Sequence, residues 1–339
     1  DRGGASALMF AVDSGHAGVF SLLLDAGADI ELRDNDGRTA LIRAAASGQT
    51  RFVAPLLESG VPLDAVDYAG ATALMIAAAN DHSPVVQELI DAGADVHIED
   101  YDGANALYYA LEDAASGGRG VTRSAELLLR AGAEIPSDDN LGGALAFEAA
   151  ESGNTELLSL LFEAGVRPGV TDNNGNTLLI AGAAYPSVAA DLIERDVSVN
   201  ASNRFGETAL LRAVRQGERE SARILLSAGA NPDATDEEGR SVLMLAATES
   251  DTELVRQLLI GGASVWARDS RSATVLHYAA ERGSADVIRL LLTAGADVSS
   301  SRDDGRQPID MAVAADRSPD IIDLLVMAGA TPPEDAAEG

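Results

Sequence analysis

The side chains in this sequence that are best suited to chemistry are few. The chain has four histidines and no cysteine, and its 24 basic residues are all arginine. The missing cysteine excludes disulfides, thiolate catalysis and zinc–sulfur sites, and the missing lysine excludes a P-loop lysine and Schiff-base chemistry. His277, in the segment ATVLHYAAERG at 273–283, therefore has three possible roles: acid–base catalysis, metal ligation or a structural role.

Carboxylates, by contrast, are abundant, with 54 Asp and Glu residues. A calcium-binding loop of the EF-hand type needs acidic residues at its first, third and fifth positions. The first of these positions is apolar in the acidic loops of this chain, at Leu32, Ile98, Val170 and Ala234. The acids lie on turns, where solvent keeps pKa values ordinary, and no GxSxG or HExxH motif is present. We expect no metal, no cofactor and no enzyme activity; a pocket that buries a carboxyl group would reopen the enzyme hypothesis.

Charge and composition restrict the partners. The net charge is −30, which disfavours nucleic acid, anionic lipid and self-association, so we expect a monomer. No apolar run approaches the roughly 18–20 residues that span a bilayer, so we expect a soluble chain. The sequence begins at Asp1 without Met, so a leader or an upstream segment could have been removed. The compartment stays open between cytoplasmic and periplasmic or secreted.

A repeat of about 33 residues organises the chain, as in DNDGRTALIRAAASG (34–48) and DEEGRSVLMLAATES (236–250). In most repeats an Asp is followed by a turn Gly, an N-capping Ser or Thr and an alanine-rich helix. A second helix follows and ends at a Gly suited to the left-handed C-cap. The turn position is occupied by Gly4, Gly37, Gly70, Gly103, Gly142, Gly175, Gly206, Gly239, Ser272 and Gly305.

This pattern resembles the ankyrin repeat, and TVLHYAAERGSADVIRLLLTAGADV (274–298) is its best single match. The resemblance implies an all-α solenoid, a curved stack of helix-turn-helix and hairpin units, because one such unit cannot bury its apolar face alone. We predict one solenoid of about ten repeats over 1–330, irregular at 111–129 and 181–196. Residues 331–339 are expected to form a disordered acidic tail.

The internal repeats decide the role of His277. The equivalent positions are mostly apolar, for example Met75 and Met244, which indicates an inward-facing position. The resemblance implies that a His here bonds neighbouring backbone and steadies the hairpin. His16, His82 and His97 lie far from one another and show no metal-ligand spacing. We therefore predict that His277 is part of the scaffold.

The resemblance further implies that the hairpin tips and the first helices line a concave binding face. Tyr68 and Tyr101 occupy equivalent tips of adjacent repeats and are suited to anchor a partner, although they could simply cover one another. The Asp ladder that begins each hairpin, with Asn203 as one rung, is expected to be structural. The candidate partner-binding residues are Asp36, Tyr68, Tyr101, Asp102, Asn140, Asn173, Phe205, Glu237, Glu238 and Arg271. Arg119 and Arg123, in the loop of the irregular fourth repeat, are further candidates.

The function that these patterns favour is a non-enzymatic scaffold for another protein, one with a basic surface that complements the acidic face. Two alternatives stay open. The chain could be the regulatory or targeting arm of a larger protein, or it could recognise a small molecule or peptide at repeats 4–6. The sequence does not identify the partner.

Overall fold

The structure is a computed structural model that describes residues 3–115, 122–135 and 139–331. Over these ranges the chain forms 20 α-helices and one 3-10 helix, with isolated β-bridges but no extended strand. The all-α prediction is confirmed. The chain divides into two compact units, Asp1–Val170 (unit 1) and Thr171–Gly339 (unit 2), and each is described by itself.

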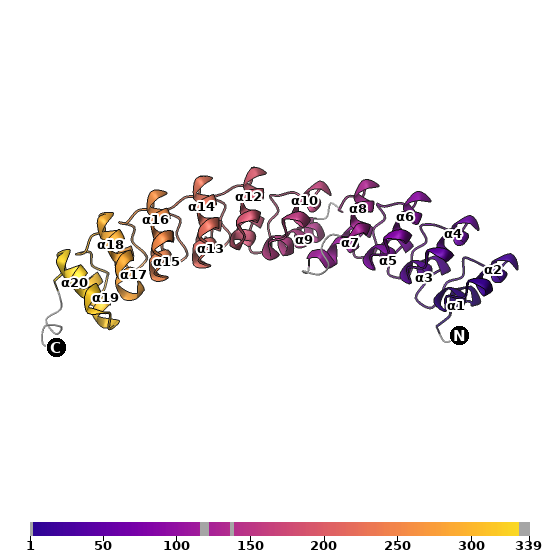
Figure 1. The fold of residues 1–339 in the computed structure, drawn as a ribbon, viewed down its shortest axis with the longest axis horizontal. Coiled ribbons are helices and arrows are strands. Elements are labelled where there is room, and N and C mark those ends of the chain that lie inside the picture. The colour runs from indigo at the N-terminus through magenta and orange to yellow at the C-terminus, as the bar shows by residue number, and fades with distance from the viewer. Residues whose placement is uncertain (1–2, 116–121, 136–138, 332–339) are drawn as a thin grey trace. The chain divides into compact units, whose positions relative to one another are not determined.

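Unit 1 consists of paired antiparallel helices joined by short turns, with a tight hairpin turn leading from most pairs to the next (Figure 1). Its helices are α1 (Ala7–Asp13), α2 (Ala17–Asp25), α3 (Ala40–Ala46), α4 (Thr50–Glu58), α5 (Ala73–Ala79), α6 (Ser83–Asp91), α7 (Ala106–Ala115), α8 (Arg123–Arg130), α9 (Asp139–Ser152) and α10 (Thr155–Glu163).

Unit 2 repeats this arrangement, and its first helix is the shortest. Its elements are α11 (Leu178–Ala181), η1 (Gly182–Ala184), α12 (Pro186–Glu194), α13 (Ala209–Arg215), α14 (Arg219–Ser227), α15 (Val242–Thr248), α16 (Thr252–Ile260), α17 (Val275–Arg282), α18 (Ala285–Thr293), α19 (Pro308–Ala314) and α20 (Pro319–Met327).

Within each unit the first helices of the pairs pack side by side in one row, and the second helices form another row. The core lies between the rows and is built from small and aliphatic side chains, such as Ala44, Leu74, Leu243 and Leu291, which are almost completely buried. Alanine allows the short first helices to approach closely, so stacking buries the apolar face that a single repeat would leave exposed.

The predicted cap and turn residues have the expected geometry. Thr39, Thr72, Thr177, Thr208 and Ser241 each accept a hydrogen bond from the backbone N–H three residues later, as N-caps do. Nine of the ten predicted turn positions have positive φ, including Ser272 at 62°. Residues with no Cβ adopt this region at least cost, which explains why glycine recurs there.

The tenth position, Gly142, corrects the prediction. We expected a hairpin with Asn140 at its tip, but these residues belong to helix α9, Asp139–Ser152. The reason is local: Ala144 stands where the other repeats place a Ser, Thr, Asn or Gln, so no capping side chain stops the helix from extending backwards. Gly142 then packs so closely that a Cβ would lie 2.6 Å from Ile135 Cγ2 and 2.8 Å from Val166 Cγ2.

The other irregular segments connect the two helices within repeat 4 and within repeat 6. In repeat 4, α8 begins after Thr122, whose hydroxyl caps the helix and donates to Ala110 O at 3.2 Å. In repeat 6, the first helix is reduced to α11, one turn long, followed by η1 and then by Pro186 at the start of α12. The shorter connection in the irregular segment 181–196 is thus accommodated by the 3-10 helix η1, which is wound more tightly than an α-helix.

Candidate functional site

The hairpins are held by the Asp ladder. Asp34 Oδ1 accepts backbone hydrogen bonds from Asp36 N (2.9 Å) and Arg38 N (2.8 Å), and Asp269 Oδ1 does the same for Arg271 and Ala273 at 2.8 Å each. Asp67, Asp100, Asp172 and Asn203 make the same pair of bonds. These side chains satisfy the backbone amides of the turns, so the prediction that the ladder is structural is confirmed for these rungs.

The second carboxylate oxygen of several rungs is bound by the side chain nine residues later, on the first helix. Arg43 Nη2 lies 2.6 Å from Asp34 Oδ2, and the hydroxyls of Tyr109 and Tyr278 donate to Asp100 and Asp269 at 2.5 and 2.6 Å. Burial alone would raise the pKa of Asp34, but hydrogen bonds from Arg38 N, Arg43 and Asp36 N outweigh it and lower that pKa. Burial, and then the bond to the ladder carboxylate, raises the pKa of both tyrosines.

Successive hairpins are also bonded to one another. Tyr68 N donates to Asp36 O (3.0 Å) and Tyr101 N to Ala69 O (3.2 Å) in unit 1, as Ser270 N does to Glu238 O (3.0 Å) in unit 2. Arg268 donates to Ser272 O and Ser301 O, both at 3.0 Å, and so joins two hairpins of unit 2. These bonds fix the spacing of the tips within each unit, which makes the tips a rigid surface.

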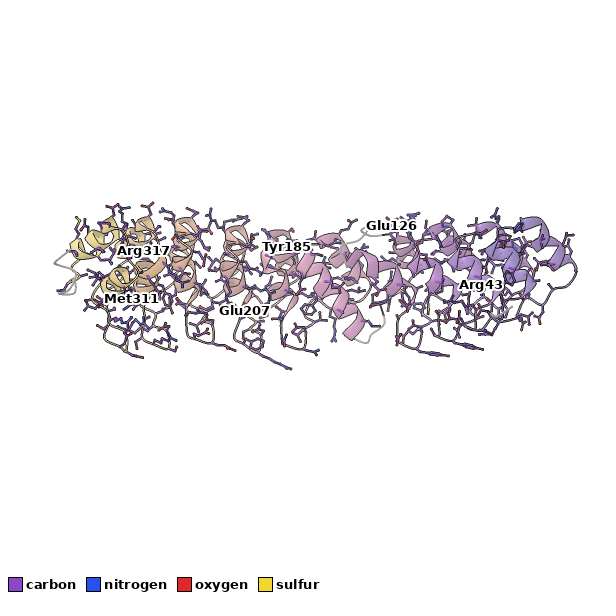
Figure 2. All side chains as sticks on the ribbon, turned by 90° about the horizontal axis from the view of Figure 1, so that it is seen from below. Arg43, Glu126, Tyr185, Glu207, Met311 and Arg317 are labelled. Carbon is purple, nitrogen blue, oxygen red and sulfur yellow. The ribbon has the colours of Figure 1, made fainter. Side chains whose placement is uncertain are left out.

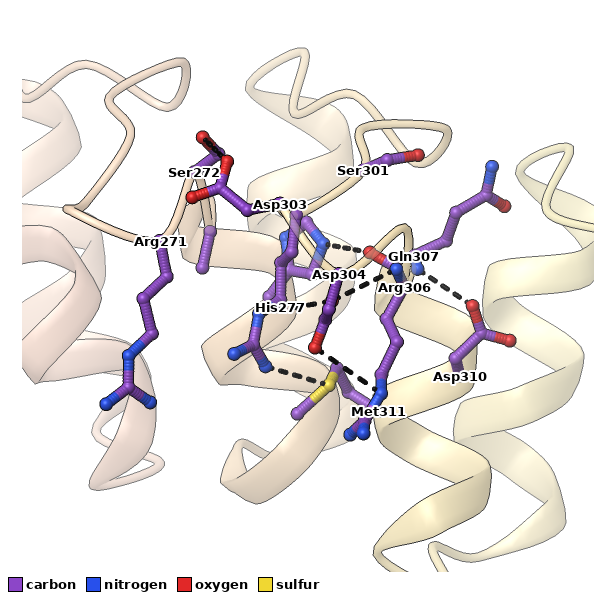
Figure 3. A network of polar contacts seen from close by, with 12 residues as sticks. Arg271, Ser272, His277, Ser301, Asp303, Asp304, Arg306, Gln307, Asp310 and Met311 are labelled. Carbon is purple, nitrogen blue, oxygen red and sulfur yellow. Dashed lines mark hydrogen bonds and ion pairs between the residues drawn. The ribbon is translucent and has the colours of Figure 1, made fainter.

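His277 also joins two hairpins through hydrogen bonds. Its ring is buried, Nδ1 accepts from Thr274 N at 3.1 Å, and Nε2 lies 3.1 Å from Arg306 O on the next hairpin (Figure 3). Because Nδ1 accepts, Nε2 carries the proton and donates to that carbonyl. Burial lowers the pKa of His277, so the neutral ring is favoured. The prediction that His277 belongs to the scaffold is confirmed.

In unit 1 the predicted tyrosines are the most prominent apolar groups of the hairpin tips. Tyr68 is 67% exposed and Tyr101 is 77% exposed. Each ring lies against the glycine of the preceding hairpin: a Cβ on Gly37 would lie 2.7 Å from Tyr68 Cδ1, and one on Gly70 would lie 3.1 Å from Tyr101 Cδ1. The rings therefore rest on backbone and keep their outer faces open to solvent. Asp36 and Asp102 are exposed beside them.

In unit 2 the predicted residues also lie on hairpins and are exposed, namely Asn173, Phe205, Glu237, Glu238 and Arg271. Figure 2 shows the hairpin side chains of this unit on one side of its helices. Glu238 lies 3.2 Å from Arg240, whereas the Arg271 guanidinium has no hydrogen-bond or ion-pair partner over the described ranges. The structure brings Glu238 and Arg271 together around one hollow and leaves Asn173 away from it.

That hollow has a volume of about 610 Å³ and lies between the hairpins of unit 2 and the helices α13, α15, α17 and α19. We call it the arginine groove, because five guanidinium groups line it: Arg215, Arg240, Arg271, Arg282 and Arg302. The sequence analysis found only Arg271. The sequence offers only a general signal for the rest, since unit 2 contains 15 of the 24 arginines, and this signal does not single out the five that line the groove.

Of the two loop candidates, Arg119 and Arg123, the structure describes only Arg123. Arg123 is the first residue of α8 and pairs with Glu126 on the same helix. Arg119 lies outside the described residues, as does the side chain of Asn140 and the predicted tail from 332 onward.

Neither a metal centre nor a membrane span is found in the part of the chain that the structure describes. There, no three His, Asp or Glu residues come together in a way that could hold a metal ion. No helix in the same ranges is both long and apolar enough to cross a bilayer.

Comparisons with known proteins agree with this architecture. The family model described as ankyrin repeats (3 copies) matches residues 1–67, 56–139, 145–236 and 243–335. Among curated proteins, none is significantly similar to the chain. An ankyrin repeat domain from Acinetobacter baumannii AYE is similar at 27% identity and a TM-score of 0.51, covering 55% of this chain and 98% of that one. A chain from the complex of a predatory endopeptidase with an immunity protein, from Bdellovibrio bacteriovorus, is similar at 26% identity and a TM-score of 0.50, covering 54% and 96%.

Proposed function

Because the chain belongs to the ankyrin repeat family, whose repeats generally mediate protein–protein interaction, we propose that it is a non-enzymatic scaffold that binds a partner protein through the hairpin tips of unit 1. The observation that carries this proposal is the exposed tyrosine pair, Tyr68 and Tyr101, held on the glycines of neighbouring hairpins. Tyr offers a large face with a polar end and loses little entropy when bound, so it is a favoured anchor.

The charge around the pair indicates the chemistry of the partner. Asp36 and Asp102 are exposed on the same tips, and unit 1 contains 9 arginines against 27 acidic residues. A partner with a basic surface would meet complementary potential there, which speeds and orients encounter. The Bdellovibrio neighbour, a chain from a complex of an endopeptidase and an immunity protein, supports a role in binding another protein.

The test is an affinity capture from a lysate of the source organism with three immobilised chains: the parent, Tyr68→Ala/Tyr101→Ala and Trp266→Ala. Trp266 is 67% exposed, like Tyr68, but lies on a hairpin arm of unit 2, so its variant controls for the loss of any exposed aromatic side chain. We expect a protein that the parent and Trp266→Ala retain at physiological salt and that the tyrosine variant loses.

Two results would overturn the proposal. The first is capture of the same proteins by all three chains, with release at moderate salt, because this would indicate diffuse charge alone. The second is retention of no protein by the parent.

A further inference from the structure

The arginine groove of unit 2 is unusual in a chain whose net charge is −30. Its walls are the hairpin turns near Arg240, Arg271 and Arg302 on one side and the ends of α13 and α17 on the other. Its volume of about 610 Å³ falls in the range of pockets that hold a small ligand or a few residues of a peptide. The groove is therefore large enough for a short extended segment.

Three of the five guanidinium groups already have internal partners. Arg240 lies 2.7 Å from Asp236 and 3.2 Å from Glu238, and Arg215 lies 2.6 Å from Glu207. Arg302 donates to Met311 Sδ at 3.4 Å and lies 3.9 Å from Asp304. Close acids therefore balance the charges of Arg240 and Arg215, whereas the Arg302 side chain is mostly buried in the wall of the groove, where its Nε has no hydrogen-bond partner among the described residues.

Arg271 and Arg282 remain available. Figure 3 shows the Arg271 side chain extending away from the polar network of the neighbouring hairpin, and no partner for it is found in the described ranges. Arg282, 71% exposed, makes only a loose 3.9 Å contact with Glu281. Two guanidinium groups without firm partners thus line one hollow, one from a hairpin and one from the end of α17.

The acids of the groove compensate only in part. Both carboxylate oxygens of Asp269 already accept hydrogen bonds, from two backbone amides and from the Tyr278 hydroxyl. Glu238 is paired with Arg240, which leaves Glu249 and Glu281 as the acids without a close cation. A ligand that supplies carboxylates can make bidentate contacts with Arg271 and Arg282.

We propose that the arginine groove binds a short, carboxylate-rich peptide segment of a partner, with Arg271 and Arg282 as its principal contacts. The proposal adds a second recognition surface, of opposite charge preference, to the protein-binding role proposed for unit 1. At about 0.15 M salt the Debye length is ~8 Å, so the acidic surface beyond the groove is screened and the local guanidinium groups decide the binding.

The experiment titrates a fluorescently labelled, acetylated hexaglutamate peptide with the full chain at physiological salt and follows its anisotropy. The test variant is Arg271→Gln/Arg282→Gln. The matched control is Arg256→Gln/Arg289→Gln, which removes the same charge from α16 and α18, where both arginines are similarly exposed and paired within their helices. We expect saturable binding that the test variant weakens about tenfold and the control leaves within twofold.

Four results would overturn the proposal: no binding of hexaglutamate by the parent; equal weakening in both variants, which indicates diffuse charge; equal binding of the matched hexaglutamine peptide; and stronger competition by an RNA oligonucleotide than by unlabelled hexaglutamate. Salt-sensitive self-association that only Arg271→Gln/Arg282→Gln removes would assign the groove to a second copy instead. The Tyr68→Ala/Tyr101→Ala chain should bind the peptide as the parent does, so failure of the unit 1 proposal leaves this test intact.

Discussion

In unit 1 the hairpin tips present Tyr68 and Tyr101 beside exposed acids, whereas in unit 2 the corresponding face presents the arginine groove. The two units contain the same number of acidic residues, 27 each, but 9 and 15 arginines, so their net charges are −18 and −12 and together give −30. Asp34 and Asp269 show that the same pair of ladder hydrogen bonds supports the hairpins of both units. The comparison shows that the ladder positions are set by the fold, while the residues beside them are free to give each face its own chemistry.

The largest effect is expected from removing a ladder carboxylate in unit 1. Asp34→Ala should lower the free energy of unfolding by about 2–4 kcal/mol, because it leaves two part-buried turn amides without their acceptor and leaves Arg43 with Asp13 as its remaining carboxylate partner. Urea unfolding followed by circular dichroism measures this change. Asp36→Ala is the matched control: its side chain is 69% exposed, so we expect a change within about 0.5 kcal/mol. Equal effects of the two substitutions would contradict a structural ladder.

Much of this scaffold follows from short stretches of sequence. Thr39 and Thr72 act through a residue three positions away, and each turn glycine acts through its own φ, so the repeat register alone predicts them. The hairpin expected at 139–142 fails because Ala144 lacks a capping side chain, a signal that is present in the sequence but is outweighed by the repeat pattern.

The candidate sites were predictable to different degrees. The tyrosine pair stands out because both residues occupy one position of adjacent repeats. The arginine groove does not, because Arg215, Arg240, Arg271, Arg282 and Arg302 come from different positions of several repeats. Which of their charges are balanced depends on partners such as Asp236 and Glu207, and only the folded unit shows those pairs.

The tyrosines that bind ladder carboxylates test whether the same hydrogen bond stabilises both units equally. Tyr109→Phe in unit 1 and Tyr278→Phe in unit 2 each remove one hydroxyl that donates to a carboxylate, at 2.5 and 2.6 Å. We expect losses of about 1–2 kcal/mol in both cases, since hydrogen bonds to charged groups contribute more than neutral ones. Chemical unfolding of each variant measures the losses. A clear loss in one variant only would show that the ladder contributes unequally in the two units.

His277 should make the stability of unit 2 depend on pH. Burial lowers its pKa from 6.5 in the folded state, so the unfolded chain binds the proton more readily. The stabilisation is complete above pH 6.5 and is lost as the pH falls from there through the lowered pKa of the folded protein. His277→Gln should remove this loss from the unfolding midpoint measured across that range. A midpoint that falls equally in the parent and the variant would assign the dependence to other groups.

The smallest effect is expected from introducing the hydrogen bonds of His277 at the equivalent position of unit 1. Met75 occupies the position of His277, and its Sδ accepts from Thr72 N at 3.4 Å, as His277 Nδ1 accepts from Thr274 N. The next hairpin also offers an equivalent carbonyl: Ala104 O accepts from Asp100 N at 2.9 Å, as Arg306 O does from Arg302 N. Met75→His should therefore change the stability at neutral pH by less than about 1 kcal/mol, because a bond to Ala104 O offsets the altered packing.

Below pH 6.5 the same substitution should destabilise unit 1, since protonation of a buried imidazole would place an N–H against Thr72 N–H. Met75→Leu, which keeps the volume and lacks the titrating ring, should show no such step in unfolding experiments across this range. The Met75→His chain could instead be strongly destabilised at neutral pH and insensitive to acid. This result would mean that the hydrogen bonds of His277 depend on the residues around it. Asp269, Arg268 and Arg302 would then be the groups responsible, because they carry the charges that act on His277 and because Met75 has Asp67 but neither arginine at the equivalent positions.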